Sequence, residues 1–147
     1  MKENKHLQLL IIGDVDATNP YAIDSEFINQ FSNDKHIHFL GRKENVTDYL
    51  ALSDLYIYPS FYREGVPRSV LEAMSMSLPI ITTDMPGCNR TVVQNENGLL
   101  IKPNSIVEIE TAIKNMFQLE SDLSNFGKKS RLLVIERFQD KKVFEKI

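Results

Sequence analysis

LYIYPSFYREGVPRSVLEAM, residues 55–74, places an apolar run typical of a strand directly before a run that predicts a helix beginning at Pro67. Proline suits the first helical position, because the N–H that it lacks would have no partner there. The unpaired N–H groups of the next residues point out of the helix start and attract an anion. Gly65 has no side chain, so a ligand can approach the backbone closely. The stretch predicts a strand-to-helix junction that binds phosphate.

Two acidic residues, Glu64 and Glu72, bracket this junction. Acids beside an anion site make sense if they hold something neutral, and a carboxylate accepts hydrogen bonds from the vicinal hydroxyls of a sugar. A nucleotide sugar carries such hydroxyls on both sides of its diphosphate. The simpler alternative is an exposed loop with an acid near a helix start, where negative charge is mildly favourable. The spacing of the two glutamates does not decide between these alternatives.

Strand-like and helix-like runs alternate along the whole chain. The periodicity predicts strands at 7–12, 37–40, 55–58, 79–82 and 98–101, and helices at 23–31, 46–52, 67–77 and 89–94, with further helices after residue 105. This order predicts an α/β fold, a Rossmann-like doubly wound parallel sheet with helices on both faces. Such sheets bind ligands outside the carboxyl ends of their strands. The loops at 13–14, 41–43, 60–67 and 84–88 each follow a strand, so we expect them to line one rim.

Composition limits the classes of function. The 147 residues are 42% hydrophobic and 25% charged, which is ordinary for one soluble domain with a core. A net charge of −3 provides no basic surface for nucleic acid, so no nucleic-acid partner is expected. Cys88 is the single cysteine and forms no metal-ligand pattern with the three histidines, which indicates a reducing, cytoplasmic setting. The apolar run near the N-terminus is too short for a signal peptide or a membrane span.

Residues 58–74 resemble the donor-binding signature of the family 4 retaining glycosyltransferases, which have the two-domain GT-B architecture. The strand-like runs ending at Asp14, Arg42, Ser60, Asp84 and Ile101 are similar, in order, to the second to sixth strands of that family's C-terminal domain. The runs EGVPR (64–68) and TDMPGC (83–88) resemble bacterial enzymes that build capsule, O-antigen and lipid-linked oligosaccharides.

The resemblance implies roles for particular residues. Glu64 is expected at the catalytic centre, near the ring hydroxyls of the transferred sugar, and Glu72 is expected to hold the ribose. The loop at 41–43 matches the place where the family receives the nucleobase. The other donor-binding residues implied are Gly13, Asp14, Gly41, Arg42, Lys43, Ser60, Gly65, Val66, Pro67, Arg68 and Ser69, and those of the interdomain cleft loop are Asp84, Pro86 and Gly87.

The resemblance also implies the reaction: transfer of a hexose or N-acetylhexosamine from a nucleoside diphosphate sugar, with UDP favoured, and with retention at the anomeric carbon. Fixed N–H dipoles at a helix start can stabilise the departing diphosphate, so no cofactor and no metal are expected. The acceptor would be a saccharide or a lipid-linked sugar. The parent protein would be cytoplasmic, at the inner face of the membrane if it associates with one peripherally.

Part of the resembling architecture has no counterpart in residues 1–147. We expect one truncated nucleotide-sugar-binding domain, without the acceptor-binding N-terminal domain and without the first strand of the donor domain. Loss of that strand should leave a gap in the sheet or force its two neighbours to pair, and the isolated chain should be inactive. The alternatives are a noncatalytic Rossmann-like nucleotide-binding or interaction module and a sugar-nucleotide epimerase-like domain.

Overall fold

A computed structural model describes residues 7–15, 22–118 and 120–139 of the chain, and the side chains of 120–122 lie outside the description. The chain forms two compact units, residues 1–46 and 47–147. That all 147 residues act as one donor-binding domain stays a prediction.

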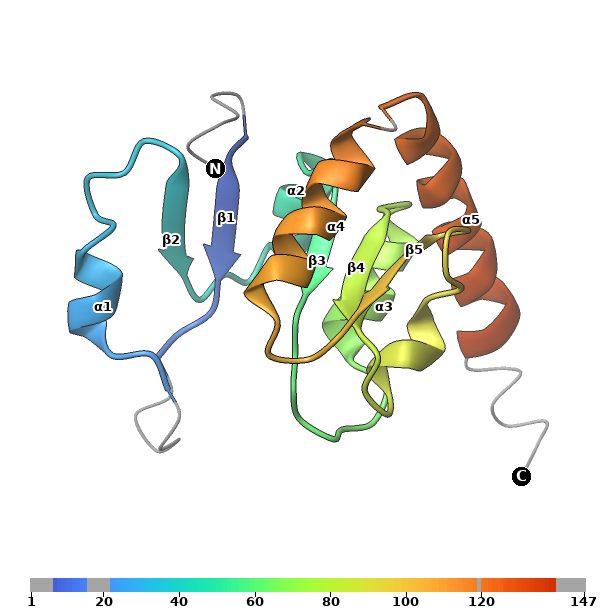
Figure 1. Cartoon of the computed structure of the whole chain (residues 1–147), viewed down its shortest axis with the longest axis horizontal. Helices are drawn as coiled ribbons and strands as arrows, with labels where there is room; N and C mark the ends of the chain where they lie inside the picture. Colours follow the sequence, from blue (N-terminus) through green and yellow to red (C-terminus); the bar gives the residue numbers. More distant parts are fainter. Residues whose placement is uncertain (1–6, 16–21, 119, 140–147) are drawn as a thin grey trace. The chain divides into compact units, whose positions relative to one another are not determined.

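The strands form two parallel sheets, one in each unit. In the first unit, β1 (Leu9–Ile12) pairs with β2 (Ile37–Gly41). In the second unit, β3 (Tyr56–Tyr58), β4 (Ile80–Thr83) and β5 (Gly98–Ile101) pair in the order β3-β4-β5 (Figure 1). Parallel strands alternating with helices confirm the predicted α/β class. Within the described residues no ladder joins β1 to β3, so these two strands do not pair; that a strand is missing between them stays a prediction.

The helices follow the predicted order with shifted ends. They are α1 (Ser25–Asn29), α2 (Val46–Ala51), α3 (Arg68–Ser75), α4 (Ile106–Gln118) and α5 (Glu120–Phe138). α1 begins after Asp24, whose carboxylate accepts a hydrogen bond from the Phe27 N–H at 2.6 Å, as expected of an N-cap. The helix predicted at 89–94 is wrong in type and extent: η1 (Cys88–Thr91) is a single 3-10 turn that begins after Gly87.

One part of the core of the second unit lies between its sheet and α4. Its buried members are Ile81, Ile101, Ala112, Met116 and Phe126, and Ile57 of β3 packs against them. Figure 1 shows α4 in front of this sheet and α3 behind it. Successive side chains of a strand point to opposite faces, so Tyr56 and Tyr58 point to the α3 side.

On the α3 side, α5 packs closely against the end of α3. A Cβ on Gly127 would collide with the carbonyl oxygen of Ser77, so glycine allows this approach. The Arg131 guanidinium also donates to the Ser75 carbonyl at 3.1 Å, which satisfies an acceptor that the end of α3 leaves open. α5 therefore fixes the position of α3 through contacts at the C-terminal end of α3.

A buried asparagine ties the loop before β5 to α5. Asn97 accepts from the Val93 N–H at 2.7 Å, and it donates to the Thr91 carbonyl at 3.0 Å and to Ser130 Oγ at 3.3 Å. Ser130 Oγ lies 3.2 Å from the Asn97 carbonyl, to which it donates. Buried polar groups are stable only when paired, and this network satisfies each of them.

Candidate functional site: a strand-to-helix junction with two glutamates

The Glu64 carboxylate is held by two hydroxyl groups from the end of β3. Ser60 Oγ donates to Glu64 Oε1 at 2.9 Å, and the Tyr58 hydroxyl lies 3.1 Å from Oε1 and 3.3 Å from Oε2. Glu64 is half-buried. A carboxylate with two donors on one oxygen has a defined orientation and keeps acceptor capacity on the other oxygen.

Tyr58 is a hydrogen-bond donor throughout the physiological range. Burial is the largest cause that raises the pKa of its hydroxyl, and with the negative charge of Glu64 and the hydrogen bond to it the pKa reaches about 12. The phenol therefore remains protonated and can donate only one hydrogen bond, which it gives to Glu64.

Two buried threonines of β4 fix the backbone that carries these hydroxyls. Thr82 Oγ1 donates to the Tyr58 carbonyl at 2.7 Å, and Thr83 Oγ1 donates to the Ser60 carbonyl. Their contacts hold the end of β3 and the start of its loop against the neighbouring strand.

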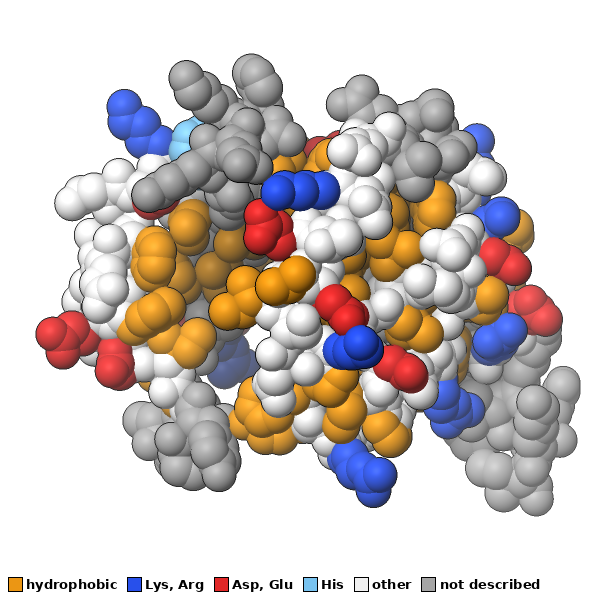
Figure 2. Space-filling view, in the orientation of Figure 1, with side chains coloured by type: hydrophobic (Ala, Val, Ile, Leu, Met, Phe, Trp, Pro, Cys, Tyr) orange, Lys and Arg blue, Asp and Glu red, His pale blue; other side chains and the backbone are white. Residues whose placement is uncertain are grey.

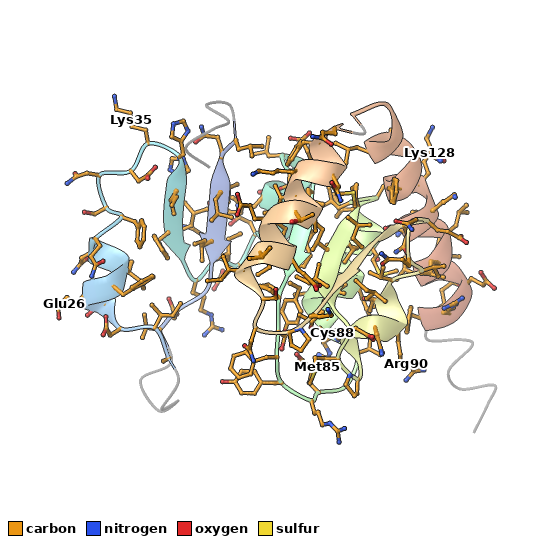
Figure 3. The ribbon with its side chains drawn as sticks, in the orientation of Figure 1. Glu26, Lys35, Met85, Cys88, Arg90 and Lys128 are labelled. Atoms are coloured by element: carbon orange, nitrogen blue, oxygen red, sulfur yellow. The ribbon has the colours of Figure 1, made fainter. Side chains whose placement is uncertain are left out.

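The loop after β4 packs on the Glu64 turn. Gly87, with φ +95°, lies so close that a Cβ would collide with the carbonyl oxygens of Glu64 and Gly65. Figure 3 shows Met85, Cys88 and Arg90 of this segment near the end of β4. In the same loop, Asn89 donates to the exposed Asp84 carboxylate at 3.0 Å. The predicted cleft loop thus meets the predicted donor loop through Gly87.

The start of α3 leaves its first N–H groups without side-chain partners. Pro67 is the N-cap, with φ −66° and ψ 124°, and it makes no capping hydrogen bond. The prediction that Pro67 is the first helical residue is wrong by one position, because its ψ is extended while its carbonyl accepts the first helical bond, from Leu71 N at 3.3 Å. The first turn contains no acid, and it exposes Arg68. An anion can take the place of the missing cap.

Glu72 is exposed on α3, one turn after Ser69 and on the same face of the helix. Burial raises the pKa of Tyr56; a hydrogen bond with the Ser69 side chain acts against this shift, and the charge of Glu72 adds to it. Tyr58 thus contacts Glu64 directly, whereas Tyr56 is linked to Ser69 by a hydrogen bond and experiences the charge of Glu72.

In the first unit, the loops after β1 and β2 are joined. The Gly13 N–H donates to the Gly41 carbonyl at 3.0 Å, and Asp14 Oδ1 accepts from the Arg42 N–H at 3.0 Å. Gly41 has φ +67°, which a residue with a side chain rarely adopts. Lys43 follows, half-buried.

The predicted site residues therefore fall into two groups. Gly13, Asp14, Gly41 and Arg42 meet in the first unit, while the second unit holds Ser60, residues 64–69, Glu72 and residues 84–87. That both groups line one rim stays a prediction. Sequence reasoning missed Tyr58, although the strand alternation that places it on one face with Tyr56, beside a loop with an acid, could have indicated it.

A separate hollow lies on the α4 face of the second sheet. It has a volume of about 330 Å³ and is lined by Pro59, Thr83, Lys102, Asn104, Ser105, Ile106 and Ile109. Figure 2 shows hydrophobic side chains over the loops that follow β3 and β4, at the lower edge of the view; Phe61 and Tyr62 are exposed members of the loop after β3.

Within the described ranges, no group of three or more His, Cys, Asp or Glu side chains could hold a metal ion. None of the helices that the structure describes is long and apolar enough to cross a membrane.

Known proteins resemble the chain in sequence and in fold. A Campylobacter jejuni N,N'-diacetylbacillosaminyl-diphospho-undecaprenol alpha-1,3-N-acetylgalactosaminyltransferase is 29% identical over 110 residues, 75% of this chain and 28% of the relative. An Escherichia coli UDP-Gal:alpha-D-GlcNAc-diphosphoundecaprenol alpha-1,3-galactosyltransferase is 29% identical over 141 residues, 94% of this chain and 35% of the relative. The chain thus spans about a third of the length of these curated relatives.

Among solved structures, Anabaena HepE in complex with UDP matches with a TM-score of 0.85 and 19% identity, over 97% of this chain and 41% of that one. This likeness concerns the fold. A sequence model of the family described as Glycosyl transferases group 1 matches residues 1–133. Because this match covers most of the 147 residues, the chain belongs to the glycosyl transferases of group 1.

Proposed function

We propose that the chain is the donor-binding part of a retaining glycosyltransferase that takes a sugar from a UDP-linked donor. The observation that carries the proposal is the α3 start, where an uncapped helix N-terminus lies between an oriented Glu64 and an exposed Glu72. An anion with a hydroxyl-rich group on each side fits this arrangement of charge and hydrogen-bonding groups.

In the proposed complex, the diphosphate lies at the first turn of α3. The N–H groups of Arg68, Ser69 and Val70 have no acceptor within the helix, so they can bind phosphate oxygens. They can also stabilise the charge that develops as the diphosphate leaves, and they need no reorganisation to do so. Glu72 would hold the ribose, and Glu64 would hold the hydroxyls of the transferred sugar.

The nucleobase would lie at the loop that begins at Gly41. Its backbone is shaped by the Asp14 contact, which uses the Arg42 N–H. The base would therefore bind to other backbone groups of residues 41–43. The choice of uracil is supported by relatives and fold neighbours whose names contain UDP or UDP-Gal.

The whole enzyme would act on a saccharide or a lipid-linked acceptor in cell-surface polysaccharide synthesis, as the names of its relatives suggest. The acceptor would be held by polypeptide outside these 147 residues. We place this enzyme in the cytoplasm, at the inner face of the membrane if its acceptor is lipid-linked.

Calorimetric or NMR titration of the chain with UDP, GDP and UDP-glucose tests the proposal. We expect weak binding of UDP, with GDP weaker. Glu72→Gln should weaken UDP binding by about tenfold to a hundredfold, because a hydrogen bond to a charged group contributes roughly 1.5–3 kcal/mol. Glu96→Gln, at an exposed position in the turn before β5, is the matched control and should bind UDP like the wild type. Absence of nucleotide binding at millimolar concentration would favour a noncatalytic interaction module.

A transfer assay tests the incomplete character of the site. The isolated 147 residues should not transfer sugar from UDP-glucose or UDP-N-acetylglucosamine to a saccharide, because the proposed acceptor-binding part of the enzyme would be missing from the assay. Robust turnover by the purified chain would contradict this expectation.

A further inference from the structure

Glu64 depends on other residues for its orientation, and this dependence adds to the proposed function, on which the inference rests. We infer that Tyr58 and Ser60 are positioning residues that orient the Glu64 carboxylate and leave its Oε2 atom to accept a hydroxyl of the donor sugar.

The first support is the geometry of the two donors. Both approach the same oxygen: Ser60 Oγ lies 2.9 Å and the Tyr58 hydroxyl 3.1 Å from Oε1. A carboxylate oxygen has two lone pairs, so these two donors fill the acceptor capacity of Oε1. Oε2 lies 3.3 Å from the same Tyr58 hydroxyl oxygen, which has a single proton to donate, so Oε2 keeps acceptor capacity for a ligand. The hydroxyl of Ser60 is thus engaged within the protein.

The second support is the rigidity of the positions that carry the donors. Tyr58 is the last residue of β3, opposite Thr82 in the ladder with β4. The Thr82 and Thr83 hydroxyls bind the carbonyls of Tyr58 and Ser60, and both threonines are buried. A group that orients a carboxylate must itself be held on a fixed backbone, because a hydrogen bond from a misplaced donor stabilises the required orientation much less.

The third support is that the Glu64 turn is confined from a second direction. Gly87 contacts the carbonyls of Glu64 and Gly65, so the backbone of the turn cannot move toward the loop after β4. With its backbone confined by Gly87 and its carboxylate held by Tyr58 and Ser60, Glu64 has one orientation to present to a ligand.

The test compares the affinities of the chain for UDP and for UDP-sugars, with UDP-glucose and UDP-N-acetylglucosamine as probes. The probe used for the variants is whichever of these two UDP-sugars the wild type binds more tightly. The difference between the affinities of the wild type and Glu64→Gln for this UDP-sugar measures the contribution of Glu64. Tyr58→Phe and Ser60→Ala should each weaken binding of that UDP-sugar by about threefold to tenfold, because each removes one hydrogen bond to a charged group. Both variants should bind UDP like the wild type.

Two controls separate positioning from general damage. Tyr62→Phe removes a phenol hydroxyl from the same loop, where the exposed ring stacks on Phe61 at a centroid distance of 4.2 Å, and it should leave both affinities unchanged. Ser60→Thr keeps a hydroxyl and should keep the affinity for the UDP-sugar. Melting temperatures confirm that each variant is folded.

A spectroscopic readout follows the same contact without ligand. Removal of the Glu64 charge in Glu64→Gln should lower the pKa of Tyr58 from about 12. The pKa is measured from the absorbance change of the tyrosines in alkali. The transition that is lost in Tyr58→Phe is assigned to Tyr58. If Tyr58 titrated identically with and without the Glu64 charge, the contact and the inference would be refuted.

The outcomes distinguish the two levels of the proposal. A selective loss of UDP-sugar affinity in Tyr58→Phe and Ser60→Ala supports the positioning role. Wild-type affinities in both variants, combined with a loss in Glu64→Gln, would overturn that role and leave the proposed function intact. A wild-type chain that binds no uridine nucleotide at all would overturn both.

Discussion

At the scale of single residues, the site depends on hydroxyl groups that direct carboxylates and on a glycine that allows two loops to meet. Tyr58 shows why the first matters: its hydroxyl is partly buried beside a negative charge, so it stays protonated and donates to Glu64. Its neighbour Tyr56, two residues earlier on the same strand face, lies by Ser69 and Glu72. Of the two tyrosines, Tyr58 makes the hydrogen bond to a glutamate, while the pKa of Tyr56 is raised mainly by burial and also by the charge of Glu72.

The raised pKa of Tyr58 predicts a loss of stability in alkali. The folded state holds this proton more tightly, with a pKa of about 12 against 10.0 for an unperturbed tyrosine. The stabilisation is therefore fully present below pH 10 and is lost as the pH rises from 10 to 12. Urea unfolding across this window should show a smaller decline in free energy for Tyr58→Phe than for the wild type. Parallel declines would contradict the prediction.

Gly87 predicts a strong effect of one methyl group. Gly87→Ala should destabilise the chain by about 2 kcal/mol or more, because the methyl collides with two backbone carbonyls and φ is +95°. Gly65→Ala is the matched control: the added methyl meets open space, so a change within about 0.5 kcal/mol is expected. Chemical denaturation of both variants measures the difference, and equal stabilities would show that the loops can separate at no cost.

At the scale of elements, α3 is the helix that presents the site, and its position is set by packing at its far end. Its buried residues Val70, Ala73 and Met74 face the protein, while Arg68 and Glu72 stay exposed. α5 packs against α3, and Gly127 and Arg131 contact the backbone at the end of α3. A change in α5 can therefore move the binding helix without touching the site.

Gly127→Ala tests this packing through the sign of its effect. In an exposed helix, alanine in place of glycine stabilises by about 1 kcal/mol. Here the methyl would collide with the Ser77 carbonyl, so we expect a loss of about 1–3 kcal/mol instead. Lys128→Ala, at the exposed next position of α5, should stay within about 0.5 kcal/mol of the wild type. Thermal or urea unfolding decides, and a stabilised Gly127→Ala would show that α5 does not press on α3.

The Asn97 network predicts a graded series between β5 and α5. Asn97→Ala should cost about 2–4 kcal/mol, because it opens a cavity and leaves the Val93 N–H and the Thr91 carbonyl without their partner. Ser130→Ala should cost less, since Asn97 keeps its other two bonds. Urea unfolding of the two variants gives the order, and an Asn97→Ala variant as stable as the wild type would refute a structural role for the network.

At the scale of the whole molecule, burial differs sharply between the two units. Among residues 7–15 and 22–46 none is fully buried, whereas the second unit buries Val70, Ile80, Ile81 and Met116 completely. Hydrophobic burial provides most of the free energy of folding, so the two units should differ in local stability.

Amide hydrogen exchange measures this difference. The amides of β4 should exchange only with global unfolding, while those of β1 and β2 should exchange through local opening at lower free energy. Addition of saturating UDP should slow exchange in the loop at 41–43 if that loop receives the base as proposed. Equal protection of β1, β2 and β4 in the free chain would indicate one cooperative unit instead.

Much of the fold could be predicted from local patterns, and the failures have physical causes. β5 has the predicted bounds, because strand alternation depends on neighbours in sequence. The helix predicted at 89–94 is wrong because contacts distant from its own pattern set the backbone there: Gly87 lies against the Glu64 turn, and the Val93 N–H donates to the Asn97 side chain instead of to a helical carbonyl. The glutamates could be named from a motif, whereas strand alternation could indicate only the face on which Tyr58 lies and not its hydrogen bond to Glu64, which depends on the fold of the loop.

By itself, the sequence determined the α/β order of elements, the strand-to-helix junction at Pro67 and the resemblance to a transferase family, because these reside in periodicity and in short motifs. Only the tertiary structure decided that the strands divide into two sheets, that Tyr58 and Ser60 orient Glu64, and that Gly87 closes on the same turn. The physical reason is that a hydrogen bond or a close contact forms only when the two groups are brought to the right distance and orientation, which local sequence patterns do not specify. Here that distance and orientation are set by β4, more than twenty residues further along the chain, through Thr82 and Thr83.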